Sequence, residues 1–106
     1  PFHFAAAAAA MDAQVEIYFT ARSVRLLLPG VAAALYAGSP DDPTHRSIGD
    51  YMDDAREQGV VFFACTAALQ AQGLSMNDLM PGWARAGGAV RFMDRTMDAR
   101  WRTLTF

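Results

Sequence analysis

The sequence contains no lysine, a single cysteine and no apolar stretch long enough to cross a membrane. Because all nine basic residues are arginines, Schiff-base chemistry on a lysine and phosphate binding by a P-loop lysine are excluded. One cysteine cannot form an internal disulfide, and no run approaches the ~20 apolar residues of a transmembrane helix. With 11 acidic residues the net charge is −2, so no excess of basic residues would dominate binding to a polyanion. We therefore expect a cytoplasmic protein that binds neither nucleic acid nor a membrane.

The length of 106 residues is enough for one domain, spanning 1–106, and too short for two. Hydrophobic residues make up 53% of the chain, against ~45–50% in ordinary globular chains, and six of them are methionines. A richer core explains this excess, and apolar surface that packs against a partner subunit explains it equally well. The composition leaves both explanations open.

Hydrophobic periodicity and turn residues divide the first half of the chain into alternating helices and strands. The expected elements are a helix over 1–13, a strand over 15–20, a short helix over 22–28, a short apolar segment over 31–36 and a loop over 38–43. Ser47 and Asp50 form a pattern like a capping box, so the next helix should begin there. It should run to about Gln58 and stop at Gly59. Its apolar positions at helical spacing are Ile48, Tyr51, Met52 and Ala55.

The second half continues the alternation. The apolar run VVFFA at 60–64 predicts a central parallel strand that is covered on both faces. A short helix over 66–72, ended by Gly73, and a loop over 74–83 should follow. An amphipathic helix is expected from Ala86, and RTLTF at the C-terminus alternates like a last strand. The apolar positions of that helix are Ala89, Val90, Met93 and Met97.

This order of elements predicts a parallel sheet with helices on both faces. An alternating fold normally starts with a strand, whereas this chain starts with the helix over 1–13. We therefore expect that a first, central strand precedes this helix and is missing from the chain.

Cys65 is the first candidate for chemistry, because it directly follows the predicted central strand. Ligands of open α/β sheets bind just beyond the carboxyl ends of the strands. The next helix would direct its free N–H groups towards the sulfur, which favours the nucleophilic thiolate. The alternative is that Cys65 only fills space in the core, as cysteine often does. The sequence leaves both roles open.

Four segments taken together resemble the DsrE/DsrF-like family, which includes the DsrE and TusD sulfur-relay subunits. They are VEIYFTARSVRLL, VVFFACTAALQAQGL, SMNDLMPGWARAGG and the closing RTLTF, and PFHFAAAAAAMDA resembles the first helix of such proteins. The resemblance implies a flavodoxin-like, three-layer fold with five strands, the first of which precedes the helix over 1–13. It also implies trimers or hexamers, which the apolar composition allows.

The resemblance further implies a role for Cys65. In relay members a cysteine at the end of the fourth strand carries sulfur as a persulfide, and Cys65 in FFACTAAL matches that position. Thiolate attack on a donor persulfide would move the outer sulfur to Cys65, and the thiolate of a partner would then take it. This chemistry would make the protein a sulfur carrier, and possible activity as a persulfide sulfurtransferase follows from it.

Other polar residues are weaker candidates for the same site. Arg22 and Ser23 follow a predicted strand and could bind an anion, and the alternative is that Arg22 is a solvated loop residue. Thr66 is next to Cys65, and His3 could face the same edge of the sheet. Asn77 could lie nearby, although Asn77 and Asp78 also fit turn chemistry.

No metal or cofactor is expected. His3, His45 and Cys65 lack metal-ligand spacing, and His45 should be exposed in a polar loop. Neither a G-x-G-x-x-G pattern nor a Walker motif occurs, and a G-x-S-x-G hydrolase elbow is also absent. Two alternatives to a carrier are a non-catalytic oligomeric binding module and a redox-sensing thiol.

Overall fold

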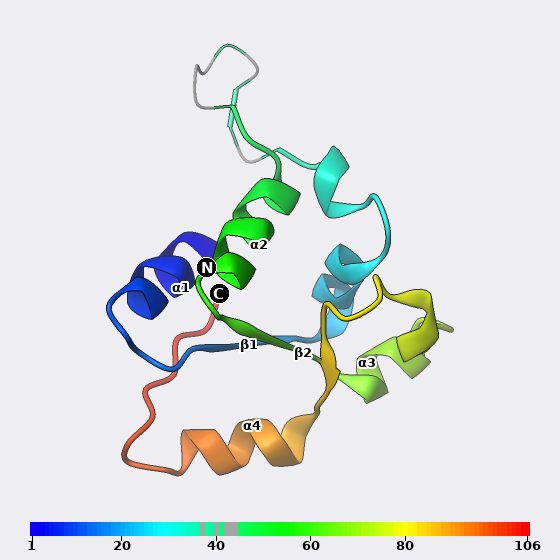
Figure 1. Cartoon of the computed structure of the whole chain (residues 1–106). Coiled ribbons are helices and arrows are strands. Elements are labelled where there is room, and N and C mark those ends of the chain that lie inside the picture. Colours follow the sequence, from blue (N-terminus) through cyan, green and yellow to red (C-terminus); the bar gives the residue numbers. More distant parts are fainter. Residues whose placement is uncertain (37, 40, 42–44) are drawn as a thin grey trace.

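The computed structural model describes residues 1–106 except 37, 40 and 42–44, and it places a parallel sheet between layers of helices (Figure 1). The α-helices are α1 (Phe2–Ala10), α2 (Ile48–Glu57), α3 (Thr66–Ala71) and α4 (Ala89–Thr96). The strands are β1 (Glu16–Phe19), β2 (Val61–Ala64) and β3 (Arg85–Ala86). The short 3₁₀ helices are η1 (Ala21–Leu27), η2 (Ala32–Ala34) and η3 (Met76–Asp78).

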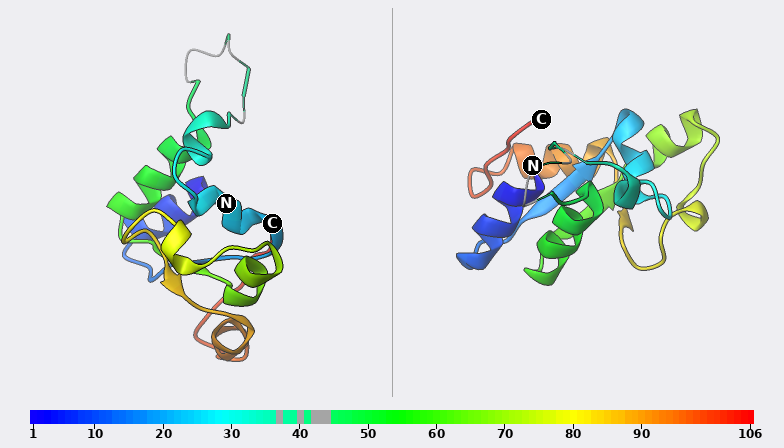
Figure 2. Two further views of the ribbon diagram at one scale, coloured as in Figure 1. Left: turned by 90° about the vertical axis from the view of Figure 1, so that its right-hand side faces the viewer. Right: turned by 90° about the horizontal axis from the view of Figure 1, so that it is seen from above.

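Strand β2 is the centre of the sheet, as its apolar sequence predicts. It pairs in parallel with β1 along its whole length, from Glu16↔Val61 to Phe19↔Ala64. On its other side it pairs in parallel with β3, but only through Phe63↔Arg85 and Ala64↔Ala86. Helices α1 and α2 lie on one side of the sheet and α4 lies on the other, as the end-on view of α4 in Figure 2 also shows. The predicted α/β fold, with a parallel sheet and helices on both faces, is therefore confirmed.

Local signals in the sequence also predict several element ends correctly. The Ser47 side chain accepts from the Asp50 N–H at 3.0 Å, and the Asp50 carboxylate accepts from the Ser47 N–H at 3.0 Å, so the capping box of α2 forms. Gly59 and Gly73 follow the ends of α2 and α3 with φ of +89° and +70°, where a side chain would be strained. The loop expected over 38–43 falls partly outside the described residues.

The main core lies between the sheet and the α1–α2 layer. Phe62 is its largest fully buried side chain, with 2% of its surface exposed. Its ring lies 6.0 Å from that of Phe2 and 5.2 Å from that of Phe19. Met52 and Ala55 bury the inner side of α2 against this cluster. Aromatic rings from α1, β1 and β2 therefore hold the two layers together.

The opposite face of the sheet carries a charged and aromatic layer. The Glu16 side chain is 8% exposed, and its carboxylate pairs with Arg95 at 2.7 Å and with Arg91 at 3.6 Å. The Tyr18 hydroxyl donates to the same carboxylate at 3.1 Å, and its ring stacks on Phe63. Burial, and then the neighbouring Glu16 carboxylate, raise the pKa of Tyr18. These contacts pack the polar side of α4 against the sheet.

As a result α4 turns its apolar side to solvent. A surface helix with apolar spacing of this kind normally directs its apolar stripe to the core. Here Val90, Met93 and Met97 are 88%, 48% and 81% exposed. The core-facing positions are instead taken by the two arginines that bind Glu16 and by Phe92, whose ring meets Tyr18 at 5.3 Å.

Two sequence predictions about the C-terminal third are wrong. The helix expected from Ala86 begins three residues later, because Arg85 and Ala86 form β3. The last strand expected over 102–106 does not form, and this segment is exposed without regular structure. Alternation alone does not make a strand where no neighbouring strand supplies a ladder of hydrogen bonds. The segment instead runs back to α1, where Phe106 stacks on Phe4 (Figure 1).

None of the helices in the described part of the chain is long and apolar enough to cross a membrane.

Candidate functional site

Cys65 lies where β2 ends and α3 begins. Its N–H donates to the carbonyl of Phe19, the last residue of β1, at 2.9 Å. Its own carbonyl accepts from the N–H of Leu69 in α3 at 3.1 Å. The residue occupies the N-cap position of α3 and is partly exposed. The prediction of a cysteine at the carboxyl end of the central strand is thus confirmed, and Cys65 is not part of the fully buried core.

The chain segment that follows β1 is attached to α3 by a glutamine. The Gln72 amide donates to the carbonyl of Ala21 at 2.7 Å, and its oxygen accepts from Arg25 Nε at 2.6 Å. Ala21 has a φ of +47°, a conformation that non-glycine residues rarely adopt. These bonds hold η1 against α3, beside the turn that carries Cys65. Sequence reasoning missed Gln72 and Arg25, because the bond between them joins residues 47 positions apart.

A glycine lets the chain after β3 approach the end of β2. The Gly87 N–H donates to the Ala64 carbonyl at 3.0 Å. A Cβ atom at Gly87 would lie 2.8 Å from Cδ1 of Phe63, closer than real Cβ contacts allow. The glycine therefore permits close packing next to the residue that precedes Cys65.

Ser23 has a structural role in this region. Its hydroxyl donates to the Thr20 carbonyl at 2.6 Å and accepts from the Thr20 N–H at 3.0 Å. Both bonds close the turn that begins η1, so they use the hydroxyl within its own turn. Arg22 and Thr66 are exposed in η1 and at the first position of α3, respectively. Their place near the carboxyl edge of the sheet agrees with the prediction, and a binding role for them stays a prediction.

The remaining candidates are His3 and Asn77. Phe2 stacks on Phe19, so the start of α1, including the exposed His3, lies at the same edge of the sheet as Cys65. Asn77 is exposed in η3, and its neighbour Asp78 accepts from the Ser75 N–H at 2.8 Å, which is turn chemistry.

Neither histidine is joined to Cys65 by a hydrogen bond between described residues. His45 is partly buried rather than exposed, and its ring stacks on that of Tyr36 at 4.1 Å. Within the residues that the structure describes, no three His, Cys, Asp or Glu side chains come together as a possible metal site.

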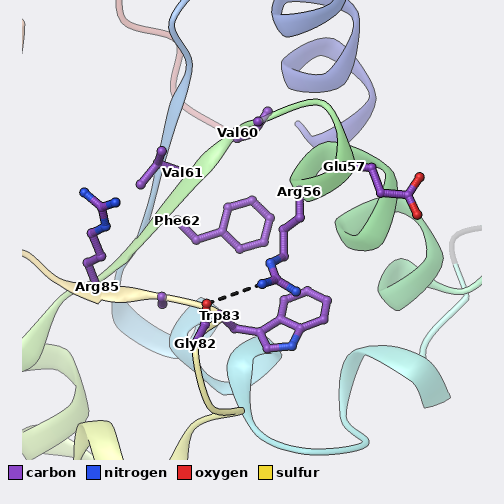
Figure 3. A pocket seen from close by; sticks show the side chains of 10 residues that line it. Arg56, Glu57, Val60, Val61, Phe62, Gly82, Trp83 and Arg85 are labelled. Atoms are coloured by element: carbon purple, nitrogen blue, oxygen red, sulfur yellow. Dashed lines mark hydrogen bonds between the residues drawn. The ribbon is translucent and has the colours of Figure 1, made fainter.

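Two pockets lie away from Cys65. The larger, of about 380 Å³, is at the amino end of β2, between the end of α2 and the turn before β3 (Figure 3). The smaller, of about 120 Å³, lies between η2 and the start of α2. Cys65 lines neither of them, so its partly exposed position is on the surface rather than in one of these hollows.

The fold and the site define a parallel, three-layer α/β domain with a single thiol at the carboxyl end of its central strand. The family model of the DsrE/DsrF-like family matches residues 1–106, the whole chain. The chain therefore belongs to the DsrE/DsrF-like family, which is flavodoxin-like in fold and generally related to sulfur relay. No curated protein and no solved structure matches the chain.

Proposed function

We propose that this protein is a sulfur carrier that holds a persulfide on Cys65 and passes the sulfur to a partner protein. The observation that carries the proposal is the partly exposed position of Cys65 at the carboxyl end of β2, in a chain of a family related to sulfur relay. Partial exposure favours a reactive thiol over a cysteine that only packs the core. The backbone bonds of Cys65 to Phe19 and Leu69 hold the main chain at this residue in a fixed place.

The chemistry needs one thiol on this chain and no external oxidant. The Cys65 thiol loses its proton, and the thiolate attacks the outer sulfur of a persulfide on a donor protein. A new S–S bond forms to Cys65, the S–S bond of the donor breaks, and the donor leaves as a thiolate that takes up a proton. An acceptor thiolate then attacks the outer sulfur on Cys65 in the same way, and Cys65 returns to its starting state. The donor and acceptor proteins are therefore the expected partners.

Mass spectrometry tests the loading step directly. After incubation with a cysteine desulfurase and cysteine, we expect the intact protein to gain about 32 Da, one sulfur atom, and the added mass to map to Cys65. Reduction should remove the added sulfur, because the persulfide bond is a disulfide-like S–S bond. A binding module in which Cys65 is inert would show no added mass under these conditions. That result, together with a thiol that resists alkylation, would reject the carrier proposal.

We further propose that copies of this chain associate through the outward apolar side of α4, as a trimer or hexamer. Val90 and Met97 are almost fully exposed there, and the ion pairs of Glu16 fix the helix in this orientation. Exposed apolar side chains that are held in one rigid row favour burial against a second surface. We also propose a cytoplasmic location, because a single cysteine gives no sign of the disulfide framework that is typical of oxidising compartments.

The double substitution Val90→Asp with Met93→Asp should dissociate such an oligomer. Two buried, unpaired carboxylates in the contact would cost far more than the association can offset. Size-exclusion chromatography with light scattering should show the variant at the mass of one chain, while the wild type elutes as a multiple of it. Met11→Asp, which changes an exposed methionine after α1, is the matched control and should leave the mass unchanged. A wild type that is already monomeric would contradict the proposal.

A further inference from the structure

The larger pocket lies at the opposite end of β2 from Cys65. It exists because β3 pairs with β2 only at Phe63 and Ala64, which leaves the edge of β2 before Phe63 beside no strand of the described structure. The chain enters β3 from a turn that is closed by a hydrogen bond from the Trp83 N–H to the Met80 carbonyl. The hollow between this turn, the edge of β2 and the end of α2 has a volume of about 380 Å³. That size falls within the ~300–1,000 Å³ of small-molecule sites.

One wall of the pocket is apolar and aromatic. Val60 and Val61 line its upper part, and the rings of Phe62 and Trp83 lie 6.3 Å apart below them (Figure 3). Phe62 belongs to the core, so this wall is rigid. A rigid apolar wall suits the hydrocarbon or ring part of a small organic ligand.

Two arginines give the pocket its charge. The guanidinium of Arg56 lies 4.0 Å from the centre of the Trp83 ring and donates to the Gly82 carbonyl at 3.3 Å. These two contacts fix the plane of the guanidinium, which has further N–H groups beyond the one that Gly82 uses. Arg85 lies on the other side of the β2 edge (Figure 3). Between the described residues it makes no ion pair.

The one carboxylate at the rim does not neutralise them. Glu57 also lines the pocket, but its carboxylate points away from Phe62 and Trp83 (Figure 3). On the side of Phe62 and Trp83 the pocket therefore carries the positive charge of Arg56, whereas the Arg85 guanidinium lies on the other side of the strand edge. A planar guanidinium matches two oxygens of a carboxylate or phosphate at once.

We propose that this pocket binds a small organic oxyanion, a phosphate ester or a carboxylate, whose apolar part packs on Val60, Val61 and Phe62. Arg56 binds the oxyanion through N–H groups beyond the one that Gly82 uses, and the aromatic wall holds the rest of the ligand. The site does not include Cys65 and its existence does not depend on sulfur transfer.

Calorimetric titration with phenyl phosphate and with benzoate tests the proposal and separates the two oxyanions. At least one of them should bind saturably with one site per chain, whereas benzyl alcohol, which has a ring and no charge, should bind at least about tenfold more weakly. Inorganic phosphate, which has the charge but no ring, should also bind more weakly. Arg56→Gln should weaken binding of the better probe by about tenfold, because it removes a charge-assisted hydrogen bond.

Arg102→Gln is the matched control, since it removes the same charge from an exposed position at the C-terminus. It should change the affinity by less than about twofold, because Arg102 does not line the pocket and an exposed charge is screened by salt. Equal weakening by Arg56→Gln and Arg102→Gln would overturn the proposal, since binding would then follow net charge alone. Absence of saturable binding by both probes would overturn it as well. A circular dichroism spectrum like that of the wild type shows that the Arg56→Gln chain is folded.

Discussion

Replacing Cys65 with serine is expected to abolish sulfur loading and sulfur transfer completely. A serine hydroxyl is not ionised at neutral pH and does not attack a persulfide, and the chain has no second cysteine to substitute for the lost thiol. The substitution exchanges sulfur for oxygen at a partly exposed position, so the cost in stability should stay within about 1 kcal/mol. A transfer assay with a labelled donor persulfide and a thiol acceptor measures the effect.

The thermal midpoint of the Cys65→Ser variant provides the first control, because it should lie close to that of the wild type. Wild-type protein alkylated at Cys65 provides the second, and it should be as inactive as the variant. If the serine variant still delivers sulfur to the acceptor, the thiol is not the carrier. The binding-module alternative would then be the better explanation of the fold.

Phe62→Ala is expected to remove about 3–5 kcal/mol of unfolding free energy, the usual cost of deleting a buried phenylalanine ring. This is a large part of the total for a domain of this size, which is typically about 5–15 kcal/mol. The ring of Phe62 contacts those of Phe2, Phe19 and Trp83, so its loss opens a cavity between the sheet, α1 and the turn before β3. Urea denaturation followed by circular dichroism measures the change.

Phe106→Ala is the matched control, because it makes the same chemical change at a ring that is 73% exposed. Its effect should lie within about 0.5 kcal/mol of zero, as for most surface substitutions. A loss of less than about 1 kcal/mol for Phe62→Ala would show that the aromatic cluster is not what stabilises the sheet against α1.

Sequence signals that act over a few residues predict much of this fold. The capping box of Ser47 and Asp50 depends only on residues three positions apart, and it begins α2 where predicted. Gly59 ends the same helix through its own backbone conformation. The apolar run at 60–64 identifies the central strand, because only a strand covered on both faces tolerates so continuous an apolar sequence. The position of Cys65 follows from these local features.

The features that were missed depend on distant partners. Strand β3 has only two residues, so no periodicity marks it, and it forms because β2 offers an edge there. The orientation of α4 follows from the burial of Glu16 on β1, about 80 positions earlier, which draws Arg91 and Arg95 inward. The periodicity of the sequence shows that one side of α4 is apolar, but it does not show which side packs against the sheet.

In the candidate site, too, local features were predicted and those that depend on the folded chain were missed. The sequence identifies Cys65 and its place in the fold, whereas the role of Ser23 depends on the turn geometry at Thr20. The pocket formed by Arg56, Trp83 and Arg85 could not be predicted, because its walls come from segments that only the folded chain brings together.

The two backbone bonds of Cys65 also limit how sulfur could travel. Its N–H is bonded to β1 and its carbonyl to α3, so the main chain at this residue cannot swing outward without breaking the sheet or the helix. A sulfur atom on Cys65 could move only by rotation about its own side-chain bonds, over a few ångström at most. Any longer travel would have to be made by the proteins that deliver and collect it, and we expect their cysteines to sit on flexible arms or tails that come to this stationary one.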